Sequence, residues 1–137
     1  MAEQDAVWAE TTDGGLLKQL FGYYPTLHDA LLVEVILDRP SDRLTIVVDY
    51  SDSVGEDLSQ SLSTRINLEW IGIDSFELPI GFEELVGLSF SRHGDKILSE
   101  LEVWPGVFGS VVSESFEARL IQVDPGDRDL MPRISYR

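Results

Sequence analysis

The chain has 137 residues, 43% of them hydrophobic and 26% charged, which is typical of one globular domain and too apolar for a disordered chain. Ten lysines and arginines stand against 25 aspartates and glutamates, and the net charge of −15 disfavours binding to nucleic acid or anionic membranes. The sequence has no cysteine, which excludes disulfides and thiol catalysis.

Residues 1–12 are predicted to form a polar N-terminal arm, often mobile at this length, from which Trp8 can fold back onto the body. Asp13 is a candidate cap for a short helix. The apolar residues of this helix recur at helical spacing and are Leu16, Leu17, Leu20 and Phe21. Gly22 favours the left-handed conformation that ends a helix. We expect this helix to pack on a sheet, because so short a helix gains its stability from packing.

Residues 30–37 form the most hydrophobic predicted strand, with Glu34 as the exception on otherwise apolar faces. Such a strand belongs near the middle of a sheet, covered on both sides. Residues 38–42 are typical of a turn. The next predicted strand, residues 44–50, forms an antiparallel hairpin with the first because the connection is short.

Residues 51–61 are rich in serine and acidic residues and predict a loop. Residues 62–70 then show the cleanest alternation of the chain, which predicts a strand with one buried face that includes Trp70. Gly72 and Pro79 predict irregularities, a bulge and an edge or turn.

The second half of the chain predicts further short strands. Its predicted segments are a helical turn at 82–85, alternation at 86–90, a hairpin turn at 92–95, strands at 97–104 and 116–123, and an irregular tail at 124–137 with a short edge segment. The whole chain, 1–137, is therefore predicted to be one α+β domain. It has a mostly antiparallel sheet of about six strands and one short N-terminal helix packed on it.

The stretch Phe21-Gly-Tyr-Tyr-Pro-Thr-Leu-His28-Asp29-Ala30, followed by alternating apolar residues, resembles the signature of the immunity protein 50 family. Members of that family are small cytoplasmic proteins of bacterial polymorphic toxin systems, inferred to neutralise a cognate toxin. The family more often shows Trp-Pro-Ser-Phe-His-Asp, and this chain has Tyr24 and Leu27 in place of the tryptophan and the phenylalanine. The matching positions, expected to be mainly structural, are Phe21, Gly22, Tyr24, Pro25, His28 and Asp29.

The pair His28–Asp29 also invites comparison with metal-dependent phosphohydrolases. A zinc site built from this pair with His93 and Asp95 would supply two nitrogen and two oxygen ligands. Adjacent residues of a strand point to opposite faces, however, which disfavours two neighbouring ligands for one metal. The structural interpretation is stronger: Asp29 accepts hydrogen bonds from the turn or from an imidazole, and His28 fixes the turn.

Other catalytic patterns are weak. No serine lies in a Gly-x-Ser-x-Gly motif or beside a histidine, and the chain lacks the glycine-rich motifs that bind nucleotides. The pairs Glu83–Glu84 and Glu100/Glu102 are more typical of a solvated face than of a glycosidase site. We therefore expect neither an enzyme nor a cofactor or metal.

The function that we expect is neutralisation of a cognate toxin in the cytoplasm. The acidic charge favours a basic toxin, such as a nuclease, because opposite charges accelerate association. The residues that we expect to meet the partner are Asp49, Asp52, Glu56, Asp57 and Trp104. One alternative is a structural or regulatory subunit that self-associates through an edge strand, for instance as a homodimer. A small His/Asp metallohydrolase is a weaker alternative.

Overall fold

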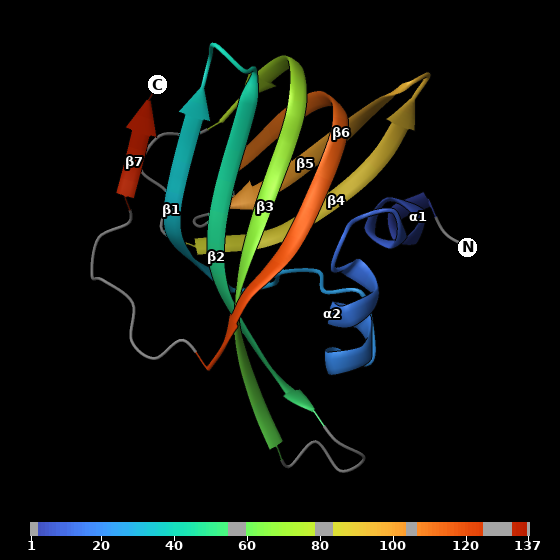
Figure 1. Ribbon diagram of the computed structural model, residues 1–137, viewed down its shortest axis with the longest axis vertical. Coiled ribbons are helices and arrows are strands. Elements are labelled where there is room, and N and C mark those ends of the chain that lie inside the picture. The colour runs from blue at the N-terminus through green and yellow to red at the C-terminus, as the bar shows by residue number, and fades with distance from the viewer. Residues whose placement is uncertain (1–2, 55–59, 79–83, 104–106, 125–132, 137) are drawn as a thin grey trace.

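The structure is a computed structural model that describes residues 3–54, 60–78, 84–103, 107–124 and 133–136 (Figure 1). Two short helices precede a sheet of seven strands. Their bounds are α1 Glu3–Ala9, α2 Gly14–Phe21, β1 Ala30–Asp38, β2 Arg43–Val54, β3 Gln60–Glu77, β4 Glu84–His93, β5 Lys96–Val103, β6 Val107–Val123 and β7 Arg133–Tyr136. The predicted α+β class with a mostly antiparallel sheet is confirmed, with one more helix and one more strand than the sequence indicates.

The strands follow the order β2-β3-β6-β5-β4-β1-β7, and β1 also pairs with β2, so that the sheet curls until β2 meets β1, while β7 lies beside β1 at the end of the order. Neighbouring strands are antiparallel, apart from the parallel pair β1–β7. The β1–β4 seam consists of the pairs Ala30–Leu85 and Leu31–Glu84. In Figure 1, β4 and β5 cross behind β1, β2 and β3, and the two helices lie beside the curled sheet.

The core fills the concave side of this sheet. The residues predicted to face inward on β2 are all buried: Leu44, Ile46, Val48 and Tyr50. Trp70 on β3 is also fully buried, as its alternation predicts, and its indole N–H donates a hydrogen bond to Ser99 Oγ at 2.8 Å. This bond satisfies the one polar atom that burying the indole would otherwise leave without a partner.

The N-terminal segment is a helix, and the prediction of an arm is wrong from Glu3 onward. Trp8 does fold back: it is fully buried and lies edge-on to Phe90 and Phe116, with ring centroids 5.7 and 5.6 Å apart. Gln4 bonds the edge of β4 twice, through Nε2 to the Leu88 carbonyl at 3.1 Å and through Oε1 to the Phe90 N–H at 2.6 Å. Tertiary contacts therefore stabilise a helix that is too short to be stable by itself.

The second helix ends as predicted, because Gly22 has φ 86° and donates its N–H to the Lys18 carbonyl at 2.7 Å. Asp13 precedes the helix, but its side chain makes no capping hydrogen bond. It accepts the Leu120 N–H at 2.8 Å instead, and it thereby ties the start of α2 to β6. The helices that the structure describes are all too short or too polar to cross a membrane.

Several predicted boundaries differ from the structure. The predicted loop at 51–61 is strand at its two ends, because Ser51–Val54 pair with Gln60–Ser63. Glu84 and Leu85 belong to β4 and not to a helical turn, and the glycine- and valine-rich passage before Phe116 belongs to β6. The irregular tail contains β7, the edge segment that the sequence predicts, while Pro79 lies outside the described residues.

Candidate functional site

The loop at 22–29, which joins α2 to β1, has a strained backbone. Leu27 and Asp29 both have φ 61°, in the left-handed region that non-glycine residues rarely adopt. The side chain of Leu27 is fully buried, and the Ala30 N–H donates to its carbonyl at 3.1 Å. Burial of Leu27 therefore anchors the loop, and the His28 and Asp29 side chains beside it remain 65% and 62% exposed.

A chain of hydroxyl groups links this loop to β2. Tyr23 donates a hydrogen bond to the Asp52 carboxylate, and its oxygen lies 2.8 Å from the Tyr50 hydroxyl. Because the Tyr23 proton points to Asp52, Tyr50 is the donor in the second bond. Partial burial, followed by the hydrogen bond to Asp52, raises the pKa of Tyr23 well above its ordinary value of 10.0. Burial also raises the pKa of Tyr50. Both phenols therefore stay protonated at neutral pH.

The motif pair forms a second polar group on the loop. His28 Nε2 lies 3.3 Å from Asp29 Oδ2. Asp29 also forms a hydrogen bond with Glu84 of β4, and this bond is the main reason that the pKa of Glu84 is raised. Asp29 and Glu84 thus place two neighbouring carboxyl groups beside the β1–β4 seam.

These two groups surround a hollow of about 460 Å³, which we call the tyrosine hollow. Its lining residues come from the loop at 22–29 and from β2: Tyr23, Thr26, His28, Asp29, Tyr50, Ser51 and Asp52. The described lining contains two carboxylates, Asp29 and Asp52, and neither lysine nor arginine. The tyrosine hollow is therefore an open, polar and electronegative site with aromatic walls.

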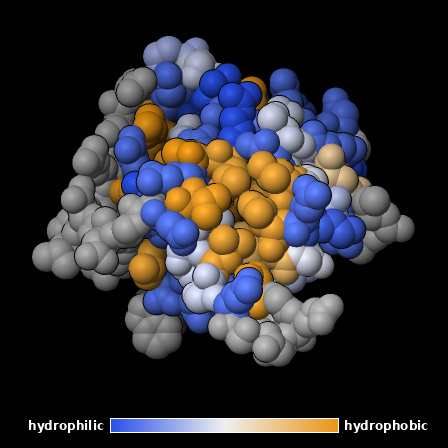
Figure 2. Space-filling model, turned by 60° about the horizontal axis from the view of Figure 1, so that its bottom comes forward, coloured by the Kyte–Doolittle hydropathy of each residue, from blue (hydrophilic) through white to orange (hydrophobic). Residues whose placement is uncertain are grey.

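An apolar patch lies at the same end of the molecule. Figure 2, which brings the lower end of Figure 1 forward, shows apolar side chains gathered over the face where α2, the β2–β3 hairpin and the end of β6 meet. The exposed or half-buried apolar residues of these three elements are Leu16, Leu20, Val54, Leu62, Leu120, Ile121 and Val123. We call this set the α2–hairpin patch. Leu62 is the cross-strand partner of Asp52, so the patch borders the tyrosine hollow.

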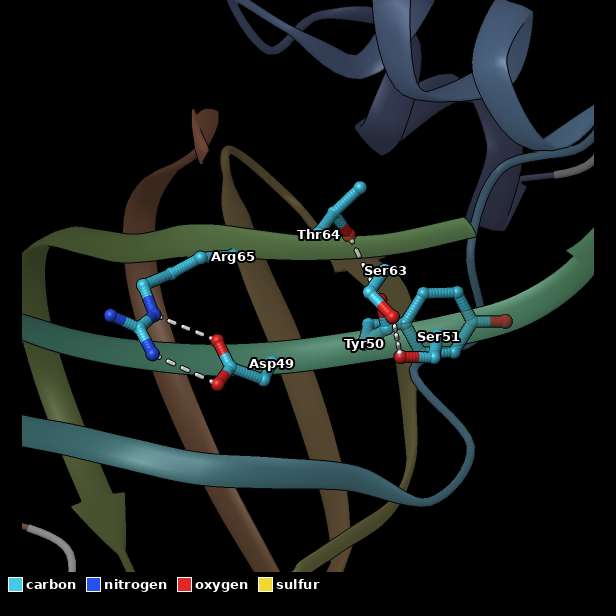
Figure 3. A network of polar contacts seen from close by, with 6 residues as sticks. All are labelled: Asp49, Tyr50, Ser51, Ser63, Thr64 and Arg65. Carbon is cyan, nitrogen blue, oxygen red and sulfur yellow. Dashed lines mark hydrogen bonds and ion pairs between the residues drawn. The ribbon is translucent and has the colours of Figure 1, made fainter. Parts of the chain in front are cut away.

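The two described acidic residues predicted to bind a partner lie on opposite faces of the β2–β3 hairpin. Figure 3 shows Asp49 facing Arg65 across the two strands, in a pair bonded through Nε at 2.7 Å and Nη2 at 3.0 Å. The Asp49 charge is therefore matched by a cation of the same chain, whereas Asp52 lies on the face that meets Tyr23. Further along the strands, the hydroxyl groups of Ser51 and Ser63 form a hydrogen bond of 2.8 Å.

The ligands of the metal-site alternative do not come together. His28 precedes β1, whose first residue pairs with Leu85, while His93 ends β4. From Leu85 to His93 a strand spans about 26 Å. Within the described ranges, no group of three or more histidine, aspartate or glutamate residues is placed to hold a metal ion.

A second, smaller hollow of about 230 Å³ is lined by residues of β4, β5 and the start of β6, together with Thr26 of the loop at 22–29. Glu100 and Glu102 line it together with Phe108, whose side chain is the most exposed large apolar one in the described chain at 67%. The two glutamates lie on the outward face of one strand, which is the arrangement of a solvated surface.

Of the remaining predicted site residues, Glu56, Asp57, Glu83 and Trp104 lie outside the described residues. The tyrosine pair is the feature that the sequence did not indicate. Tyr23 and Tyr50 are far apart along the chain and belong to no shared motif. The alternation of the predicted strand 44–50 indicates only that Tyr50 is its last inward-facing residue.

Among the known proteins, neither a family model, nor a curated sequence, nor a solved structure matches this chain.

Proposed function

We propose that the chain is an immunity-type inhibitor, which binds a basic toxin protein in the cytoplasm of the producing cell and thereby blocks it. The observation that carries this proposal is the α2–hairpin patch, an exposed apolar face in a chain of net charge −15. Contiguous exposed apolar patches on small proteins mark interaction surfaces more often than catalytic sites.

The charge of the chain supports a basic partner. Opposite net charges raise the rate of encounter between two proteins, and the apolar patch would then supply the buried area of the complex. Four of the described cations are paired with carboxylates of the chain: Arg43 with Glu69, Arg65 with Asp49, Arg92 with Glu10, and Lys96 with Glu114. The acidic residues thus remain in large excess over the cations, and a basic partner would meet little repulsion.

The resemblance of the stretch Phe21–Ala30 to the immunity protein 50 signature adds to this proposal. In the structure this stretch contributes four lining residues of the tyrosine hollow before β1 begins: Tyr23, Thr26, His28 and Asp29. The signature residues would then preserve the shape of the loop at 22–29, which follows α2 and lines the hollow. The toxin that the proposal requires is the product of a neighbouring gene.

The test is a pull-down of the neighbouring gene product, together with rescue of growth in cells that express it. We expect Leu16→Asp, in the α2–hairpin patch, to weaken capture and rescue, because Leu16 is 42% exposed and a charge there would meet the apolar side of the partner. Phe108→Asp is the matched control, because Phe108 lies at the opposite end of β6 from the patch. Absence of capture and of rescue by the unaltered chain would refute the proposed function.

A second candidate function is self-association. It is favoured by β7, which ends the strand order of the described sheet and leaves one of its edges without a described neighbour. Strand edges of this kind can pair with a second copy. Light scattering separates the two candidates, because a stable dimer that forms without any toxin supports self-association, whereas a monomer that enlarges only with toxin supports inhibition.

A further inference from the structure

The tyrosine hollow adjoins the α2–hairpin patch, and its chemistry is more specific than that of the patch. We propose that it receives one arginine or lysine side chain of a basic protein partner, whose neighbouring apolar residues cover the patch. This inference rests on the proposed function and names the group that the partner would insert.

The first argument is charge. Asp52 of β2 and Asp29 of the loop at 22–29 both line the hollow, and Asp29 is hydrogen-bonded to Glu84. Neither lysine nor arginine is among the described lining residues, and the basic side chain that is among them, His28, pairs with Asp29 at 3.3 Å. None of the described ion pairs involves Asp52, so its carboxylate is the one left to meet a cation from outside. An anionic ligand would be repelled there, whereas a cation would be stabilised by the carboxylates that line the hollow.

The second argument is the supply of hydrogen-bond acceptors and aromatic surface. Asp52 accepts one bond at each carboxylate oxygen, from Tyr23 and from the Ser53 N–H at 2.8 Å. Each oxygen has two acceptor positions, so one position at each remains for a ligand. A guanidinium presents planar donors to a carboxylate and stacks on aromatic rings. Of the two tyrosines that line this hollow, the partly buried Tyr23 is the one with exposed surface, because Tyr50 is only 3% exposed.

The third argument concerns the source of the cation. Asp52 and Leu62 are cross-strand partners, so a cation held at Asp52 lies next to the apolar residues of the hairpin. A free amine or metal ion would make no use of this patch, and no described group of ligands is arranged for a metal. A cationic side chain carried by a protein would use the hollow and the patch together.

The first experiment uses a small probe in place of the partner. The ¹⁵N-labelled full chain is titrated, at low ionic strength, with N-acetyl-arginine methylamide, and separately with the matching citrulline derivative, which has the same shape without the charge. We expect saturable amide shifts confined to the loop at 22–29 and to Tyr50–Asp52 with the arginine probe, and none with the citrulline probe. Shifts scattered over the acidic surface, or equal shifts with both probes, would overturn the proposal.

Variants locate the site. Asp52→Asn keeps a hydrogen-bond acceptor for Tyr23 but removes the charge, and we expect about threefold to fivefold weaker binding of the arginine probe, as for a partly exposed ion pair. Asp95→Asn removes the same charge from the β4–β5 turn, away from the hollow, and is the matched control. Equal binding by the Asp52→Asn variant and the unaltered chain would show that the hollow does not hold the probe.

These experiments distinguish a failure of the proposed cation site from a failure of the proposed inhibitor function. If the toxin is captured and Asp52→Asn does not weaken its capture, the hollow is not the cation site although the inhibitor function stands. If the arginine probe binds at the hollow but no toxin is captured, the site stands as a cation site and the inhibitor function fails.

Discussion

Replacing Tyr23 with phenylalanine removes the middle hydroxyl of the Tyr50–Tyr23–Asp52 chain while the ring stays in place. One of the two lost hydrogen bonds is neutral and the other ends on a carboxylate, and such bonds contribute about 0.5–1.5 and 1.5–3 kcal/mol. Because Tyr23 is only partly buried, water can replace part of this loss, and we expect about 1–2 kcal/mol of destabilisation at neutral pH. For a chain of this length that lowers the melting temperature by about 4–7 °C.

The same variant has a signature at alkaline pH. Both phenols have raised pKa values in the folded chain, while an unfolded tyrosine loses its proton near 10.0. Above that pH the unfolded state binds fewer protons than the folded state, so the free energy of unfolding falls as the pH rises. The slope is at most about 1.4 kcal/mol per pH unit for each tyrosine, and solvent reduces it for Tyr23.

Thermal melts followed by circular dichroism between pH 8 and 11 measure both effects. We expect the stability of the unaltered chain to fall more steeply above pH 10 than that of Tyr23→Phe, because the variant lacks one of the two titrating groups. Tyr24→Phe, which removes a hydroxyl from the next residue, controls for a general effect of losing a phenol. Parallel pH profiles for the unaltered chain and Tyr23→Phe would refute the hydroxyl chain.

Three further changes test other parts of the structure. Ser99→Ala should cost about 1–3 kcal/mol in chemical denaturation, because it leaves the buried indole N–H of Trp70 without its partner; an unchanged midpoint would contradict this. Asp49→Asn should lower the stability by about 1 kcal/mol through its pair with Arg65, yet leave toxin capture unchanged, since Asp49 faces away from the hollow; weaker capture would move the interface to that face. Trp8→Ala should cost about 3–5 kcal/mol and make α1 sensitive to limited proteolysis, whereas a protected α1 would show that Trp8 does not hold the helix.

Regular alternation was the most reliable guide to the fold. The inward residues of β2 and the core position of Trp70 follow directly from it, because one face of each strand is buried. In β1 the burial pattern follows strict alternation only in part. A bulge between Leu32 and Glu34 shifts the register, so that Leu32 and Val35 are both buried although their positions in the sequence predict opposite faces.

Composition misled the prediction where buried residues are small or polar. Ser113 is fully buried and the passage around it lacks an apolar rhythm, so β6 was predicted to begin later than it does. Ser51 looks like a loop residue in the sequence, yet its hydroxyl bonds that of Ser63 across the β2–β3 hairpin. Cross-strand partners of this kind cannot be seen from local sequence.

The candidate site was predictable only in part. The loop at 22–29 was singled out by its special residues, and Asp52 was expected to face a partner. The hollow, however, depends on Tyr50 meeting Tyr23 through tertiary packing, and the apolar patch depends on α2 lying beside the end of β6. Both are consequences of the curled sheet, and no local pattern encodes them.

The two hydrogen bonds of Gln4 have a consequence for handling the protein. A single amide group stands where a neighbouring strand would otherwise bond Leu88 and Phe90, so α1 shields a length of β4 from other molecules. Trimming the chain past this glutamine, or straining α1 with a bulky fusion at its start, would uncover that length, and we would expect the shortened protein to form β-rich fibrils on storage.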